Sequence, residues 1–416
     1  MDFAYTPKVR ELEQRVREFV ERHILPRNRA WHEAVEAGHF PPPFMEDLKA
    51  LAKAEGLWNM FLPHLRDDEP GTRLTNLEYA PLAEIMGRIP WSSEVFNCNA
   101  PDTGNMELLH MFATPDQRRD WLVPLLEGRI RSCFAMTEPD VPSSDATNIA
   151  TTIRREGGDY VINGRKWFIT NAADPRCKIA IVMGVTNPEG EPHRRQSMVL
   201  VPTNTPGFQV VRNITTMNHT SPIGHCEILL RDVRVPRSNL LGEEGSGFAL
   251  AQARLGPGRI HHCMRSIGQC ELALELMTAR AQERKTFGRY LHEHGAVADW
   301  IALSRCEIDQ ARLLVLKTAW MIDNLGAKAA RGEIAMIKAI VPRMQTTILD
   351  RAMQTFGAMG ISPDTPLADL WTRGRELRFA DGPDEVHLRS IARHEIRRSR
   401  DNLGAASAYL TPPERL

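Results

Sequence analysis

Residues 159–172 read "DYVINGRKWFITNA", and this stretch decides the fold class because it lies in a chain that is otherwise helical in pattern. Its β-branched and alternating residues are typical of strands. The Asn163-Gly164 pair within it predicts the tight turn of a β-hairpin. Similar short segments follow at residues 178–185, 196–203, 208–214 and 226–236. The sequence therefore predicts a β domain at about residues 131–243.

Helical periodicity precedes and follows this β zone. Apolar residues three and four apart indicate amphipathic helices. On a first helix, which we expect to end near Pro26, they are Val9, Leu12, Val16, Phe19 and Val20, and on a long later one they are Ile308, Ala311, Val315, Thr318 and Ile322. Long helices of the later kind usually pack as a bundle. The predicted fold is mainly α with a central β domain: an N-terminal helical domain at 1–130, the middle β domain at 131–243, a C-terminal helical bundle at 244–403 and a flexible tail at 404–416.

Charge and composition exclude several classes of function. Lys plus Arg and Asp plus Glu are 52 each, so no net charge attracts nucleic acid or an anionic membrane. The basic segment 389–400 contains Glu395 and is interpreted as a solvated helix face. No apolar run is long enough to span a bilayer, and neither a phosphate-binding glycine loop nor a serine-hydrolase elbow is found.

The cysteines and the termini bear on the compartment. The 7 cysteines include no C-x-x-C pair, which suits reduced thiols in a cytoplasm-like compartment. The cluster "HHCM" at 261–264 is interpreted as structural, because adjacent helical residues point in different directions, and we expect no metal site. The N-terminus lacks the apolar core of a signal peptide. We expect a bacterial cytoplasmic protein, with the mitochondrial matrix as the alternative.

Five motifs, in this order and spacing, resemble those of the acyl-CoA dehydrogenase family. They are "CFAMTEPDVPSSDATNI" (133–149), "GRKWFITNA" (164–172), "RKTFGRYL" (284–291), "QTFGAMGIS" (354–362) and "RFADGPDEVHL" (378–388). The segments "LGPGRIHHCM" (255–264) and "ADGPDEVHL" (380–388) are especially similar to the subgroup whose animal members carry a dehydrogenase domain fused to a kinase-like domain. The resemblance covers nearly the whole chain.

The resemblance implies FAD held between the domains and oxidation of a fatty acyl-CoA to its trans-2-enoyl-CoA. The α-proton would leave to a carboxylate while the β-hydrogen leaves as hydride to flavin N5. The cofactor supplies the redox chemistry, and the protein orients and polarises the substrate. The family also implies an electron-transfer flavoprotein as acceptor, and a homodimer or homotetramer as the assembly.

The family motifs carry FAD contacts onto particular residues of this chain. Those near the flavin ring are Phe134, Met136, Thr137, Ser143, Ser144, Phe168 and Thr170, and those expected near the phosphates and the adenosine half are Arg284, Phe287, Gln354, Gly357 and Glu385. Arg284 would reach FAD across a subunit interface, where a planar guanidinium suits pyrophosphate. Ser144, Arg259 and Gly382 are the expected contacts to substrate. Two assignments stay open: which of Ser143 and Ser144 meets FAD or substrate, and whether Trp167 is only core.

Asp381, in "RFADGPDEVHL" (378–388), stands where most of the family has the glutamate base. By itself it has a simpler interpretation as the cap of a following helix. The position where some relatives place the base is Gly258 here, so no rival acid exists, and acid-base chemistry would depend on Asp381. Burial against substrate and flavin would raise the pKa of its carboxyl. Two alternative functions remain: an oxygen-reducing oxidase-like flavoenzyme, or a retired acyl-CoA- or flavin-binding protein.

Overall fold

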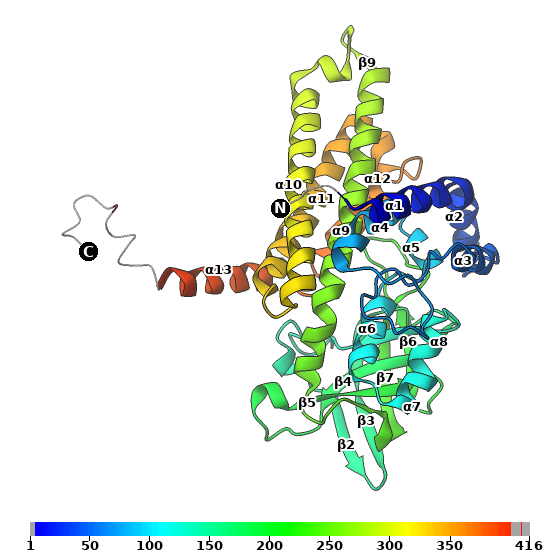
Figure 1. Cartoon of the computed structure of the whole chain (residues 1–416), viewed down its shortest axis with the longest axis vertical. Helices are drawn as coiled ribbons and strands as arrows, with labels where there is room; N and C mark the ends of the chain where they lie inside the picture. Colours follow the sequence, from blue (N-terminus) through cyan, green and yellow to red (C-terminus); the bar gives the residue numbers. More distant parts are fainter. Residues whose placement is uncertain (1–4, 401–408, 410–416) are drawn as a thin grey trace.

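The computed structural model describes residues 5–400 and residue 409, so the predicted flexible tail at 404–416 lies outside the described residues apart from Tyr409. Two groups of helices flank a single large sheet along the chain (Figure 1). The predicted fold class, mainly α with a central β domain, is confirmed. The division into domains at residues 130 and 243 stays a prediction.

The first group of helices begins with α1 (Pro7–Phe19), whose start is fixed by Thr6. The Thr6 hydroxyl accepts a hydrogen bond from the Val9 amide, and Pro7 stands in the first turn, where its missing N–H costs nothing. The chain stays helical past the expected end, through a π-helical segment at Val20–Ile24 and a 3₁₀ turn at Leu25–Arg27. The group continues with α2 (Asn28–Glu36), α3 (Phe44–Ala54), α4 (Asn76–Gly87), α5 (Ser92–Val95), α6 (Asp102–Phe112), α7 (Pro115–Gln117) and α8 (Val123–Leu126).

The central sheet has eight strands, mostly antiparallel. They are β1 (Arg131–Ala135), β2 (Thr152–Glu156), β3 (Asp159–Thr170), β4 (Cys177–Val185), β5 (Gln196–Pro202), β6 (Phe208–Asn213), β7 (His225–Pro236) and β8 (Leu240–Leu241). Their order is β6-β7-β3-β2-β4-β5-β8, with β1 parallel to β4. Alternate residues of β4 enter two cores, since Ile179 and Ile181 pack with the helices while Ala180 and Val182 pack with the other strands.

The predicted hairpin turn at Asn163-Gly164 is wrong. β3 runs through both residues, and the turn between β2 and β3 lies at Gly157–Gly158. The side-chain amide of Asn163 pairs with Asp232 of β7: Nδ2 donates to Asp232 Oδ1 at 3.0 Å, and Oδ1 accepts from the Asp232 backbone N–H at 2.9 Å. A Cβ on Gly164 would lie 2.2 Å from the Thr151 hydroxyl oxygen. Glycine is therefore needed here for a close approach of the backbone, not for a turn.

The second group of helices forms an elongated bundle. Its elements are α9 (Gly247–Glu283), the short hairpin β9 (Lys285–Thr286) and β10 (Arg289–Tyr290), α10 (Gly295–Leu325), α11 (Arg331–Phe356), α12 (Leu367–Leu377) and α13 (Asp384–Arg400). α9 runs from the sheet to the far end of the bundle, where the hairpin lies, and α13 projects away from its side (Figure 1). The predicted stripe on α10 is buried from Ile308 to Thr318, and Ile322 is half-buried.

α4 and α9 cross at very close range because glycine stands at the contact. A Cβ on Gly268 of α9 would lie 1.8 Å from the carbonyl oxygen of Glu84 in α4. The crossing ties the first group of helices to the bundle and so helps to fix α9, on which much of the candidate site lies.

Candidate active site

Asp381 lies in the bend between α12 and α13, with its carboxylate directed at α9. Its φ is +56°, and that of Gly382 is +106°, so both residues adopt left-handed backbone that sharply turns the chain. The Asp381 side chain is only 16% exposed; Oδ1 lies 4.0 Å from Nη1 of Arg254 and Oδ2 lies 3.8 Å from Nε2 of His262. Because α13 begins only at Asp384, the structure does not support the helix-cap interpretation.

Two basic side chains from different helices hold the backbone of this bend. Nε of Arg259 on α9 donates to the carbonyl oxygen of Asp381 at 3.0 Å. Nζ of Lys338 on α11 donates to the carbonyl oxygens of Leu377, in a short hydrogen bond, and of Gly382, at 3.4 Å. The predicted residue Arg259 thus contacts the bend that carries Asp381. Side chains from α9 and α11 therefore both bind the backbone of the bend.

The pKa of Asp381 is lowered from its ordinary value. Burial raises the pKa of this carboxyl, but the positive charges of His262 when protonated, Arg254, Arg259 and Lys338 outweigh burial. His262 is uncharged near neutral pH, because burial lowers its own pKa to about 3. The two guanidinium groups and the Lys338 ammonium therefore keep the carboxylate ionised. The prediction concerned burial against substrate and flavin and did not include these cations.

Arg254 and Glu107 were not foreseen in the sequence, although Arg254 precedes Gly258 by one helical turn. The Arg254 guanidinium carbon lies 4.2 Å from the centre of the Phe134 ring, and Nε donates to Oδ1 of Asn105 at 2.9 Å. Glu107 is buried nearby, and burial raises the pKa of its carboxyl well above the usual value, only partly offset by the charge of Arg254. Burial thus favours the protonated form of Glu107, whereas the surrounding cations favour the ionised form of Asp381.

The C-terminal ends of β1 and β3 meet near Arg254, which packs on Phe134 of β1. The Trp167 amide donates to the Thr137 carbonyl at 3.0 Å, and the Thr137 hydroxyl donates to the Trp167 carbonyl at 2.6 Å. Phe168 follows with φ +53° and a side chain that is 46% exposed, an unusual state for a large apolar residue. The Thr170 hydroxyl lies 3.1 Å from Nδ1 of His225. Trp167 is half-buried, so Phe168 offers the more open ring.

The loop after β1 distinguishes the two serines. Ser143 is buried, and its hydroxyl accepts a hydrogen bond from the Glu138 amide at 2.9 Å, whereas Ser144 is exposed. Beneath the loop, Nζ of Lys166 is 2.8 Å from Glu138 Oε1 and donates to the Met136 carbonyl at 2.9 Å. Ser143 therefore holds the loop together, and Ser144 is the serine available to a ligand.

The remaining predicted cofactor residues are exposed. They are Arg284, Phe287, Gln354, Gly357 and Glu385. Phe287, at the tip of the β9–β10 hairpin, is 94% exposed. Arg284 follows the end of α9, roughly 39 Å along the helix from Gly258 at 1.5 Å per residue. One copy of the chain does not bring Arg284 and Phe287 to the ends of β1 and β3.

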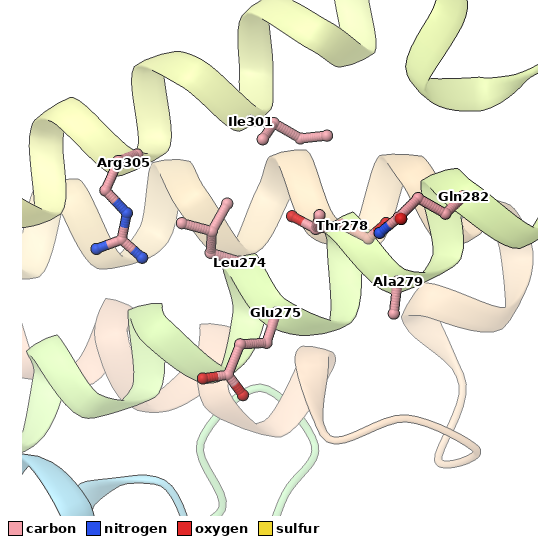
Figure 2. Close-up of a pocket in the computed structure, with 7 residues that line it drawn as sticks. All are labelled: Leu274, Glu275, Thr278, Ala279, Gln282, Ile301 and Arg305. Carbon is pink, nitrogen blue, oxygen red and sulfur yellow. The ribbon is translucent and has the colours of Figure 1, made fainter.

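A groove of about 490 Å³ lies between α9 and α10 (Figure 2). It is lined by Leu274, Glu275, Thr278, Ala279, Gln282, Ile301 and Arg305. Its nearest residue on α9, Leu274, is roughly 24 Å along the helix from Gly258. None of the predicted site residues lines this groove, so it is not where the predicted chemistry would occur.

The two adjacent histidines of "HHCM" face different surroundings. The His261 ring packs against Tyr79 and Phe61, with centroids 5.2 and 6.1 Å away, while His262 faces Asp381. Within residues 5–400, no three His, Cys, Asp or Glu side chains gather in a way that could hold a metal ion. Over the same range, every helix is too short or too polar to cross a membrane.

Comparison with known proteins identifies the family. Models of the acyl-CoA dehydrogenase N-terminal, middle and C-terminal domains match residues 6–129, 133–233 and 245–396. The chain belongs to the acyl-CoA dehydrogenase family. Members of this family are flavin-dependent oxidoreductases with FAD as cofactor, so this acyl-CoA dehydrogenase is one as well.

Its relatives include the expected subgroup. It is 56% identical over 414 residues to the probable acyl-CoA dehydrogenase FadE2 of Mycobacterium tuberculosis, covering 98% of this chain and 100% of the relative. It is 50% identical to acyl-CoA dehydrogenase family member 11 of Gallus gallus, covering 95% of this chain but 51% of the relative. A solved structure of a putative acyl-CoA dehydrogenase from Mycobacterium abscessus superimposes with a TM-score of 0.91 at 47% identity, over 95% of this chain and 100% of that one. The chain thus spans about half the length of the animal relative it matches.

Proposed function

We propose that this acyl-CoA dehydrogenase oxidises a fatty acyl-CoA to its trans-2-enoyl-CoA in fatty acid β-oxidation, with Asp381 as the base that removes the α-proton. The observation that carries the proposal is the contrast between two acids beside α9. The surrounding cations lower the pKa of the Asp381 carboxyl, whereas burial raises the pKa of Glu107 well above its ordinary value. Of these two, Asp381 is therefore the acid whose ionised form, the form that can accept a proton, is favoured.

The backbone at Asp381 also offers a donor for the substrate. The Gly382 amide donates to the Phe379 carbonyl at 3.2 Å, whereas the Asp381 amide donates no hydrogen bond within the described residues. We propose that the Asp381 N–H binds the thioester carbonyl, which makes the α-proton more acidic by stabilising negative charge on that oxygen. Ser144, Arg259 and Gly382 would contact the rest of the acyl-CoA.

The ends of β1 and β3 suit a flat aromatic cofactor, because the Phe168 ring is 46% exposed beside the Thr137–Trp167 pair. When bound, FAD supplies the electron acceptor for the β-hydrogen and its electron pair. The residues of this chain that would hold its ring are Phe134, Met136, Thr137, Ser144, Phe168 and Thr170, with Ser143 supporting the loop. Glu385 would lie near its adenosine half.

We propose that a second copy of the chain completes the cofactor site. Arg284 and Phe287 follow the far end of α9, too distant to reach the ring site of their own copy, and both are exposed. From a neighbouring copy, Arg284 would bind the pyrophosphate, with Phe287 beside it and the Gln354–Gly357 loop near the ADP part. The assembly would be a homodimer or a homotetramer, the electron acceptor an electron-transfer flavoprotein, and the compartment the bacterial cytoplasm.

An anaerobic titration of the FAD-loaded protein with saturated acyl-CoAs of graded length tests the proposal. Flavin absorbance should bleach with some chain lengths in the wild type and in the matched control Asp364→Asn, an exposed acid, and not in Asp381→Asn. A shifted spectrum without bleaching for every acyl-CoA would refute catalysis and favour a binding protein. Rapid oxygen consumption by the bleached protein would instead identify an oxidase.

A further inference from the structure

We propose that His262 is a positioning residue for Asp381, donating a hydrogen bond from its uncharged imidazole to Asp381 Oδ2 while the carboxylate takes up the α-proton. This inference rests on the proposed function of Asp381. It begins from the distance of 3.8 Å between His262 Nε2 and Asp381 Oδ2.

The spacing on α9 makes the contact feasible. Gly258 and His262 are four residues apart and so lie on one face of the helix. Because Gly258 has no side chain, the carboxylate can approach that face: a Cβ at Gly258 would lie 3.5 Å from Asp381 Oδ2. Closing the gap to His262 from 3.8 Å to hydrogen-bond length needs a shift of roughly 1 Å, and such contacts commonly tighten when substrate binds.

The tautomer of His262 follows from its other neighbour. Its Nδ1 lies 3.2 Å from Nη2 of Arg265, and a guanidinium can only donate. Nδ1 is therefore the acceptor. Burial, followed by the charge of Arg265, lowers the pKa of His262 to about 3, so the ring is neutral and carries its one proton on Nε2. That N–H is the atom facing Asp381.

The other groups facing Asp381 cannot take this role. They are Arg254 and Arg259 from α9, Lys338 from α11 and His387 from α13. Arg254 lies 4.0 Å from the other oxygen, Oδ1, and Arg259 and Lys338 bind the backbone of the bend. His387 faces Gly382, with Nε2 3.0 Å from where a Cβ would be. His262 is thus the neutral donor next to Oδ2, and it would orient the short aspartate side chain without adding charge.

The test compares His262→Gln, His262→Asn and His262→Leu with the exposed control His64→Leu, all as FAD-loaded protein. A glutamine amide can reach the position of Nε2, whereas an asparagine amide lies nearer that of Nδ1. We expect His262→Leu and His262→Asn to lower kcat about 10- to 100-fold, the range for losing one hydrogen bond to a charged group. KM should stay near the wild-type value, and the acid limb of the kcat/KM profile should move to higher pH because the carboxylate loses a donor. His262→Gln should stay within about threefold of the wild type.

Exchange of the acyl-CoA α-proton with deuterium oxide provides the second measurement and separates two kinds of failure. If His262→Leu and His262→Asn exchange and turn over like the wild type, or if His262→Gln falls as far as they do with FAD retained, the inference is wrong. If His262→Leu does not hold FAD, the contrast between the two amide variants still decides. If the wild type itself neither exchanges nor bleaches, the proposed function fails instead.

Discussion

Replacing Glu94 by glutamine should destabilise the junction between the first helices and the sheet. Oε1 of Glu94, on α5, lies 3.0 Å from Nζ of Lys49, 2.7 Å from Nη2 of Arg131 and 2.6 Å from Nη1 of Arg176. Arg131 is the first residue of β1, the strand that leads to the proposed flavin contacts. The cluster therefore attaches β1 to the helices.

The magnitude follows from burial. The side chains of Lys49 and Arg131 are 2% and 1% exposed, so a neutral residue at 94 leaves two buried cations short of a partner. Removing one member of a buried ion pair costs about 3–5 kcal/mol, while an exposed pair contributes about 0–1 kcal/mol. Glu33→Gln is the matched control, because the Arg29–Glu33 pair is 91% and 60% exposed.

The loss in Glu94→Gln should depend on pH. Burial raises the pKa of Glu94, but the charges of Arg131, Lys49 and Arg176 outweigh it and bring the pKa well below the ordinary 4.5. A folded-state pKa below the unfolded one gives stability that is full above the unfolded pKa and is lost as pH falls through the folded pKa. The difference between wild type and Glu94→Gln should therefore shrink below about pH 4.5.

Urea unfolding of the FAD-loaded proteins, followed by tryptophan fluorescence, measures both effects. We expect a much lower urea midpoint for Glu94→Gln than for Glu33→Gln at about pH 7, and a smaller gap to the wild type at about pH 4. The reasoning fails if Glu94→Gln unfolds at the same urea concentration as Glu33→Gln at neutral pH. It fails equally if the gap is independent of pH.

Further predictions concern stability at other sites. Burial lowers the pKa of Lys166 from 10.5 to about 8, so the unfolded state binds more protons between these values and wild-type stability should rise over that range. Lys166→Met should abolish this contribution in urea midpoints measured across the range. Gly268→Ala should destabilise the fold by about 1–3 kcal/mol, because the new methyl group overpacks against a carbonyl of α4, and the melting temperature should fall. Gly295→Ala, with nothing near the new methyl group, should leave the melting temperature unchanged. Thr75→Ala removes a capping box of α4 and should cost about 1 kcal/mol in thermal unfolding.

The periodicity of the apolar residues predicted the order of helices and strands, because burying one face gives each helix and each strand its own apolar repeat. The Asn163-Gly164 pair shows where local reasoning fails. A glycine that turns the chain and a glycine that lets Thr151 approach look the same in sequence, and only the neighbouring segment distinguishes them.

For the site, the motif identified Asp381, while the groups that set its chemistry escaped prediction. Arg254, His262 and Lys338 belong to α9 and α11, more than forty residues away along the chain from Asp381. Their positions depend on how these helices cross, which no local pattern encodes. These cations lower the pKa of Asp381, while the rise expected on burial against substrate and flavin stays a prediction, and Asp381 stays the best candidate for the base.

The lowered pKa changes what the proposed reaction demands of the site. A carboxylate held ionised by cations is a weaker base than one raised by burial, so more of the rate must come from acidifying the α-proton. The free amide of Asp381 is placed for that work, because it belongs to the same residue as the base and no backbone carbonyl competes for it. Substrate binding would also exclude water and so strengthen the burial effect on the carboxyl. The site therefore depends on polarising the thioester and on orienting a short carboxylate that is ionised until it takes up the α-proton.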